Sequence, residues 1–171
     1  MSSHLGEIKG LYLAHLNTRS MFNEETMTDI RLLLSDYILP VLTISETWLQ
    51  EDVTDASVHI HGYQFYRQDR ILGHKEDGGG NGAYIRDDMQ TDQESLSHLN
   101  KNTPDIEMQW LVAHRPQAKI MAICTCYRPP DGDAENFLIK LNEAITSLIQ
   151  AHPHWEIYCL GDMNLYITLD S

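Results

Sequence analysis

The first fifty residues alternate two apolar, strand-like runs with one amphipathic helix, and a polar side chain follows each run. Apolar residues at 8–16 precede Asn17, and a second short run at 41–45 ends directly before Glu46. Between the runs, apolar residues recur at helical spacing over 27–38, and Pro40 ends that stretch. Because functional groups gather where the strands of an α/β sheet end, this order favours an α/β fold with a site at one sheet edge.

The rest of the chain continues with more strands and one further helix. Asn23 and Asp133 are typical N-cap residues for the two helices. The alternation in 106–114 predicts a strand that is buried on one face only. The glycine-rich stretch 73–82 matches no phosphate-binding pattern and is expected to be a flexible hairpin loop. The further strand-like runs are at 58–66, 83–86, 106–114, 119–127 and 155–160.

Composition limits the class of protein. No repeat or linker divides the 171 residues, so a single domain over 1–171 is expected. No apolar run approaches the ~20 residues of a membrane span, and the N-terminus has no secretory-signal pattern. Three cysteines inside apolar runs indicate reduced thiols in an intracellular protein, nuclear or cytoplasmic. The net charge of −13 argues against a broad basic surface for DNA, so any contact with DNA must come from a few placed cations. It does not exclude a nuclease, because bound divalent cations neutralise a carboxylate-rich cleft.

The last apolar run, 157–160, leads into Gly161, Asp162, Met163 and Asn164. Gly161 is expected to turn the backbone out of the sheet. If the segment stays extended, Asp162 and Asn164 project side by side, because residues i and i+2 share a face of a strand. A carboxylate there can take a proton from water or bind a hard cation, and an amide can hold a phosphate oxygen. The alternative interpretation is a strand followed by an Asx turn.

Two other groups of side chains invite a metal interpretation. The histidine pairs at 59/61 and 152/154 have the spacing of a strand face, but exposed or capping histidines are favoured. The thiols of Cys124, Cys126 and Cys159 have the wrong spacing for a zinc knuckle, so buried packing is favoured for them.

Five polar residues, each in a short motif, come in an order that resembles a known superfamily. They are Asn17 in LNTRS, Glu46 in ISETWL, Tyr127 in CYRPP, and Asp162 with Asn164 in GDMN. The chain resembles the endonuclease/exonuclease/phosphatase (deoxyribonuclease-I-like) superfamily, and within it the apurinic-type endonuclease domain of non-LTR (LINE-type) retrotransposons. The segments 30–34, 66–70 and 78–86 also resemble that group, so the likeness spans about 11–164.

The resemblance implies a four-layer αββα sandwich and a Mg²⁺-dependent phosphodiesterase, with Mn²⁺ as a second possible ion. Such an enzyme nicks DNA by metal-assisted hydrolysis. By this resemblance Glu46 binds the metal with Asn17 in its shell, and Asp162 orients or deprotonates the attacking water. Asn164 holds that water or a phosphate oxygen, and Tyr127 donates a hydrogen bond to the scissile phosphate.

The resemblance also suggests which cations meet DNA and which domain accompanies this one. Arg128 follows the tyrosine and is predicted to add positive charge near the phosphate. Arg67 and Arg70 are candidate contacts with the DNA backbone, with a solvated charged edge as the alternative. A reverse-transcriptase domain of the parent element is the implied protein partner, and no membrane is expected.

The chain departs from the superfamily pattern at its end. It stops at Ser171, whereas the superfamily continues with further strands and closes with an Asp-His pair. The expected fold is therefore incomplete at the C-terminus, with weak or no catalysis. Two alternatives stay open: a catalytically dead, domesticated fragment that acts as a binding module, and a superfamily phosphatase that acts on a phosphoester other than nucleic acid.

Overall fold

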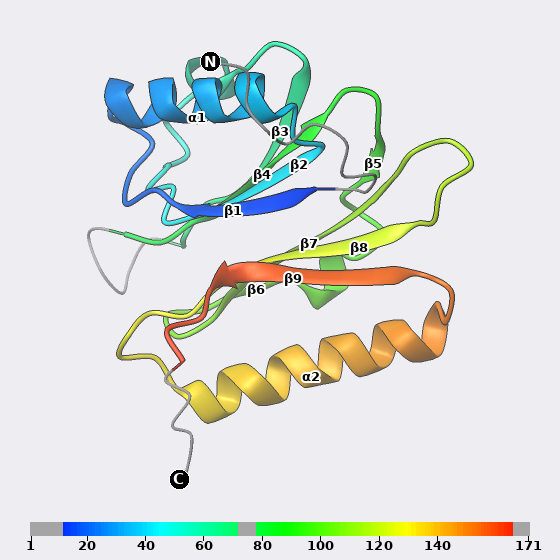
Figure 1. Cartoon of the computed structure of the whole chain (residues 1–171). Coiled ribbons are helices and arrows are strands. Elements are labelled where there is room, and N and C mark those ends of the chain that lie inside the picture. The colour runs from blue at the N-terminus through cyan, green and yellow to red at the C-terminus, as the bar shows by residue number, and fades with distance from the viewer. Residues whose placement is uncertain (1–11, 72–77, 166–171) are drawn as a thin grey trace, which may run out of the picture.

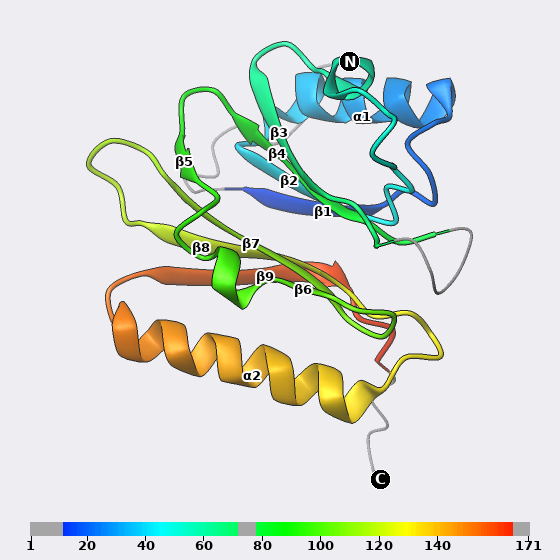
Figure 2. The ribbon, with the colours of Figure 1, turned by 180° about the vertical axis from the view of Figure 1, so that it is seen from behind.

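The structure, a computed structural model, describes residues 12–71 and 78–165. Two β-sheets pack face to face and one long helix covers the outer face of each, so the layers run helix, sheet, sheet, helix (Figure 1). Seen from behind, the four layers keep the same order from top to bottom, with the first helix and the second helix at opposite ends of the stack (Figure 2). This is the predicted αββα arrangement.

The first sheet has the strand order β1-β2-β4-β3. β1 and β2 are parallel and are joined by the helix α1, while β4 pairs antiparallel with both β2 and β3. The Asn23 side chain caps α1 as predicted, because it accepts a hydrogen bond from the Glu25 amide at 2.9 Å. The elements are β1 (Leu13–Asn17), α1 (Glu24–Tyr37), β2 (Val41–Ser45), the 3₁₀ turn η1 (Asp55–Val58), β3 (Tyr63–Gln68) and β4 (Asn81–Arg86).

The second sheet has the order β5-β7-β8-β9, with β6 also paired to β7. β8 and β9 are parallel, and the helix α2 makes the crossover between them. Asp133 caps α2 as predicted and accepts from the Asn136 amide at 3.0 Å. The elements are β5 (Gln90–Asp92), η2 (Ser97–Leu99), β6 (Lys101–Asn102), β7 (Glu107–His114), β8 (Met121–Tyr127), α2 (Ala134–Ala151) and β9 (Glu156–Asp162).

Three apolar layers hold these four structural layers together. One lies between α1 and the first sheet, around Ile30 and Ile44, and another lies between the second sheet and α2, around Trp110 and Phe137. The third lies between the two sheets and includes Ile123. Burial of aliphatic and aromatic surface is the main stabilising term in such a stack. No helix within the two described ranges is both long and apolar enough to cross a bilayer.

Three local expectations were wrong. β7 is buried on both faces rather than one, because the first sheet covers one face and α2 covers the other. Residues 58–62 form no strand; η1 ends at Val58 and β3 begins only at Tyr63. Gly161 does not turn the chain out of the sheet but pairs with Cys126 inside the β8–β9 ladder. Part of the glycine-rich loop, 72–77, lies outside the described residues.

Candidate functional site

Two rows of polar residues lie at the strand ends on one side of the sandwich. In the first sheet, ladder neighbours place Asn17, Ser45, Asn81 and Gln68 in one row. In the second sheet, the row consists of Glu107, Tyr127 and Asp162. The rows meet because Asn17 and Asp162 are hydrogen-bonded across the two sheets. The predicted edge site is therefore assembled from both sheets.

The Asn17 side chain is the link between the two carboxylates of this site. Its amide nitrogen donates to Glu46 Oε1 at 2.9 Å and to Asp162 Oδ2 at 2.7 Å. An amide group has two N–H donors, so both are used. All three side chains are only partly buried.

Glu46 follows β2 in the left-handed region, with φ of 55°. Its segment is fixed on both sides by backbone hydrogen bonds: Ser20 donates to the Glu46 carbonyl at 2.9 Å, and Thr47 donates to the Gly80 carbonyl at 3.1 Å. A left-handed non-glycine residue costs roughly 1–3 kcal/mol and persists where its surroundings hold it. Five such residues border the site, namely Arg19, Ser20, Glu46, Trp48 and Asn164.

Tyr127 ends β8 and is 6% exposed. Burial, followed by the negative charge of Glu46 and a hydrogen bond with that carboxylate, raises the pKa of the Tyr127 phenol well above its ordinary range. The phenol is therefore protonated at neutral pH. It is a neutral hydrogen-bond donor placed beside a carboxylate at the strand-end row.

Asp162 and Asn164 do not project in parallel, so the extended interpretation of this segment was wrong. Asn164 has φ of 47°, and its backbone amide lies 3.3 Å from Asp162 Oδ1, which is the Asx-turn alternative. The Asn164 side-chain amide donates to the Arg128 carbonyl at 2.8 Å. This contact anchors the turn after β9 to the end of β8.

Arg128 is 4% exposed, and its guanidinium donates to backbone carbonyls. Its Nε lies 2.9 Å from the Met163 carbonyl, and its Nη atoms donate to the carbonyls of Gly132 and Asn164. The guanidinium thus holds the turn that carries Asn164 against the loop after β8. Its predicted contact with DNA stays a prediction.

Arg67 and Arg70 also have partners within the protein. Arg67 forms a two-point ion pair with Asp69 and donates to the carbonyls of Gln50 and Val53 at 2.7 Å each. Arg70 donates from Nε to Glu107 Oε1 at 2.5 Å, and its guanidinium carbon lies 5.9 Å from the centre of the Tyr127 ring. Only Arg70 therefore reaches the site row among these two cations.

Two residues near the site were missed from the sequence. Glu107, 1% exposed, lies beside Tyr127 in the second row. His15 lies on β1 between the hydroxyls of Thr43, at 3.0 Å, and Ser45, at 3.2 Å. Burial lowers the pKa of His15, and the charge of Asp162 opposes this. Glu107 was missed because the alternation in 106–114 places it on the strand face that was expected to be exposed.

The other candidate ligands behave as expected from the sequence. His59, His61 and His154 are exposed, while His152 caps the C-terminus of α2. The three cysteines are free thiols packed on the α2 side of the second sheet. Over 12–71 and 78–165, no group of three His, Cys, Asp or Glu side chains could hold a metal ion by itself.

The site's own donor set suits a hard divalent cation that keeps part of its water shell. Mg²⁺ binds oxygen ligands and is commonly held by one or two carboxylates, together with waters and substrate phosphates. Glu46 and Asp162 supply two carboxylates that a single amide holds together. The residues present fit such an ion, with Glu46 and the Asn17 carboxamide as its protein neighbours.

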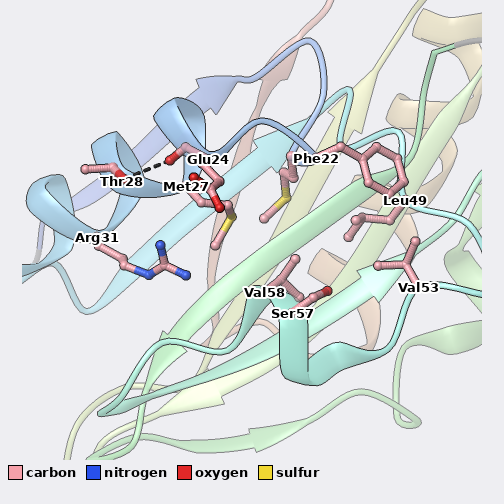
Figure 3. A pocket seen from close by; sticks show the side chains of 10 residues that line it. Phe22, Glu24, Met27, Thr28, Arg31, Leu49, Val53, Ser57 and Val58 are labelled. Carbon is pink, nitrogen blue, oxygen red and sulfur yellow. Dashed lines mark hydrogen bonds between the residues drawn. The ribbon is translucent and has the colours of Figure 1, made fainter.

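A separate cavity of about 370 Å³ opens on the outer face of the first sheet. Figure 3 shows that α1 supplies one wall, with Met27 and Arg31, and that Leu49, Val53 and Val58 face it. None of the residues predicted for the site lines this cavity.

The layers and strand order define the class: the chain has the deoxyribonuclease-I-like fold of endonuclease/exonuclease/phosphatase proteins, as the sequence resemblance implied. Among solved structures with this fold is the endonuclease domain of TRAS1, a telomere-specific non-LTR retrotransposon, at 14% identity and a TM-score of 0.62. Another is the AP endonuclease LMAP from Leishmania major, at 16% identity and a TM-score of 0.62. A third is the Xenopus laevis APE2 catalytic domain, at 13% identity and a TM-score of 0.60.

The chain is shorter than these structures. The matches cover 89%, 87% and 91% of this chain but 59%, 53% and 59% of the respective solved chains. No protein-family model matches the sequence, and no curated protein does.

Proposed function

We propose that this protein is a divalent-metal-dependent phosphodiesterase that nicks DNA, with Mg²⁺ as its ion and Mn²⁺ as a substitute. The observation that carries the proposal is the Asn17 amide, which holds the carboxylates of Glu46 and Asp162 together across two sheets. An acidic pair bound by one neutral donor, at the end of converging strands, is a suitable place for a cation and an activated water.

In this proposal Glu46 holds the metal and Asn17 lies in its shell. When bound, the ion polarises the phosphate and stabilises negative charge on the leaving oxygen. Asp162 orients the attacking water and accepts its proton, since a base must lie within hydrogen-bonding reach of the proton that it removes. Tyr127, protonated and beside Glu46, donates to a non-bridging phosphate oxygen as charge develops there.

Asn164 has a positioning part in the same scheme. Its side chain is engaged with the Arg128 carbonyl, so it holds the end of β9 and thereby the direction of Asp162. Arg128 supports the same turn from its other side. The role expected for the Asn164 amide in holding the water or a phosphate oxygen stays a prediction, because in this structure that amide donates to the Arg128 carbonyl.

DNA is the proposed substrate because the solved structures with this fold include endonucleases. Another solved structure with this fold, D. rerio TDP2, is complexed with a single-strand DNA product. A LINE-type parent element with a reverse-transcriptase domain is part of the same proposal. The net charge of −13 opposes tight binding of DNA and favours a second candidate, hydrolysis of a small phosphoester. A non-catalytic module that binds metal is the third.

The experiment is nicking of supercoiled plasmid by the purified chain in Mg²⁺, in Mn²⁺ and in chelator. Bis-(p-nitrophenyl) phosphate serves as a small phosphodiester in parallel. We expect metal-dependent nicking that Asp162→Asn abolishes, with Asp87→Asn, an exposed carboxylate outside the site, as the matched control. Hydrolysis of the small ester alone would favour the second candidate, and binding of Mn²⁺ without hydrolysis of either substrate would favour the third.

A further inference from the structure

A buried ion pair lies directly behind the proposed site and takes part in none of the steps above. Glu107 accepts from Arg70 Nε at 2.5 Å through one carboxylate oxygen and from the Gly80 amide at 2.7 Å through the other. The side chains of Glu107 and Arg70 are 2% and 12% exposed. A buried carboxylate with both oxygens engaged has a fixed position, because each contact restricts a different oxygen.

The glycines beside this pair connect it to the proposed metal ligand. Gly80 and Gly79 accept backbone hydrogen bonds from Thr47, at 3.1 Å, and Trp48, at 2.9 Å. These two residues directly follow Glu46. Glu107 holds the glycine segment, and the glycine segment in turn holds the residues that follow Glu46. The position of Glu107 therefore restricts the turn that carries the Glu46 carboxylate.

Gly79 fits this place because it has no side chain. A Cβ atom on Gly79 would lie 2.1 Å from Arg70 Nε and 2.4 Å from Glu107 Oε1, and its φ is +76°. The ion pair and the glycine backbone are therefore packed in contact, with no room between them. This close approach explains the local need for glycine in a segment for which the sequence suggested only a loop.

The same ion pair also lies beside Tyr127, the proposed hydrogen-bond donor to the phosphate. Glu107 is the ladder partner of Tyr127 between β7 and β8, and the Arg70 guanidinium lies over the Tyr127 ring, 5.9 Å from its centre. One ion pair thus places its guanidinium over the Tyr127 ring and is linked to the Glu46 segment through the glycines. Because the two charges cancel, it does so without adding net charge next to the cation site.

We propose that Arg70 and Glu107 are positioning residues, whose ion pair fixes the location of the Glu46 carboxylate relative to the Tyr127 phenol. Its catalytic consequence rests on the proposed function, but its effect on the Glu46 turn does not. Neither residue touches substrate in this scheme. Both act by restricting where the reacting groups lie, which matters because small misplacements lower rates strongly.

The test uses Glu107→Gln, which keeps the size of the side chain but removes its charge, and Arg70→Lys, which keeps a charge beside Glu107 but loses the guanidinium over the ring. Asp88→Asn is the matched control, since it breaks the Arg86–Asp88 pair of 2.7 Å outside the site. Arg70→Lys also serves as the milder variant if Glu107→Gln does not fold.

Two readouts separate this proposal from the proposed function. We expect amide hydrogen exchange at Thr47 and Trp48 to become at least tenfold faster in both variants, while exchange at Ile123 in β8 stays within twofold. We also expect kcat for plasmid nicking to fall at least tenfold with KM changed less than twofold. In the control, none of these quantities changes beyond twofold.

Unchanged exchange at Thr47 and Trp48 in a folded variant overturns the proposal, whatever the activity. Faster exchange with unchanged kcat overturns the catalytic half of it, because the Glu46 turn would then loosen without consequence. If the unmodified protein hydrolyses neither substrate, the proposed function fails, and the exchange rates alone decide whether the pair positions the turn.

Discussion

The side-chain amide of Asn17 lies 2.7 Å from the carboxylate of Asp162, although 145 positions separate them and they belong to different sheets. The same amide reaches Glu46 at 2.9 Å. Hydrogen bonds with charged groups are stronger than neutral ones, so this single side chain stabilises the approach of two like charges. The distance between the two carboxylates therefore depends on how the two sheets are placed relative to each other.

Replacing Asn17 by alanine leaves two half-buried carboxylates facing each other without the amide that links them. We expect Asn17→Ala to lower the free energy of unfolding by about 2 kcal/mol, since bonds to charged groups contribute about 1.5–3 kcal/mol each before relaxation. We also expect nicking to fall at least about tenfold, which corresponds to about 1.4 kcal/mol in the barrier. Urea denaturation and plasmid assays measure the two effects.

Asn17→Asp provides the matched comparison, because it keeps the size of the side chain and adds a third negative charge. In chelator, this variant should be less stable than Asn17→Ala, as like charges in contact repel. Addition of Mg²⁺ should reduce the difference in the free energy of unfolding between the two variants. Equal stability of the two variants in chelator would contradict the electrostatic role assigned to the amide.

The metal itself can be tested without catalysis. A ligand that binds only the folded state raises stability by about 2.7 kcal/mol at one hundred times its Kd. We expect the unfolding temperature to rise with Mg²⁺ or Mn²⁺ in the unmodified protein and to rise much less in Glu46→Gln. Glu51→Gln, an exposed loop carboxylate, is the control and should respond as the unmodified protein does. A full response in Glu46→Gln would remove that residue from the metal site.

A substitution at Gly161 tests whether the close pairing of β9 with β8 is needed to position Asp162. An added Cβ would lie 1.8 Å from the Cys126 carbonyl oxygen, so either β8 or β9 must move. We expect Gly161→Ala to cost about 3 kcal/mol of stability, at the upper end of typical overpacking, and to abolish nicking. Gly62→Ala is the control: its φ is +84° but nothing lies within 4 Å, so about 1 kcal/mol is expected from backbone strain. Equal losses in urea denaturation would contradict the steric argument.

The parts of the fold that sequence could predict are those with local causes. Asn23 and Asp133 are N-caps because their side chains accept hydrogen bonds from backbone amides two and three residues further along the chain. Such local contacts can be predicted from the residue type and its place before an apolar helical pattern. β2 was predicted with its observed bounds because a short apolar run lies between Pro40 and Glu46. The four-layer arrangement followed from the resemblance, not from periodicity.

The parts that sequence could not predict depend on distant partners. Glu107 and Arg70 are 37 positions apart. The β7–β8 ladder places Glu107 beside Tyr127, and the ion pair holds Arg70 over the same ring. The double burial of β7 likewise depends on a second sheet that no alternation within the strand encodes. Asn164 left the extended conformation because its side chain bonds the Arg128 carbonyl, a contact made 36 positions away.

His15 makes stability depend on pH near neutrality. Burial between the Thr43 and Ser45 hydroxyls lowers its pKa below the ordinary 6.5, so the folded state favours the neutral imidazole and the unfolded state takes up a proton first. Stability is then fully present above pH 6.5 and is lost as pH falls toward the folded-state pKa. Relative to His15→Gln, which cannot titrate, the free energy of unfolding should fall with a slope of at most about 1.4 kcal/mol per pH unit, the limit for one proton. Urea denaturation in chelator between pH 7.5 and pH 5 measures it. Asp162→Asn removes the opposing charge and should steepen the loss, whereas parallel curves for the unmodified protein and His15→Gln would show that the imidazole is not buried as a neutral group.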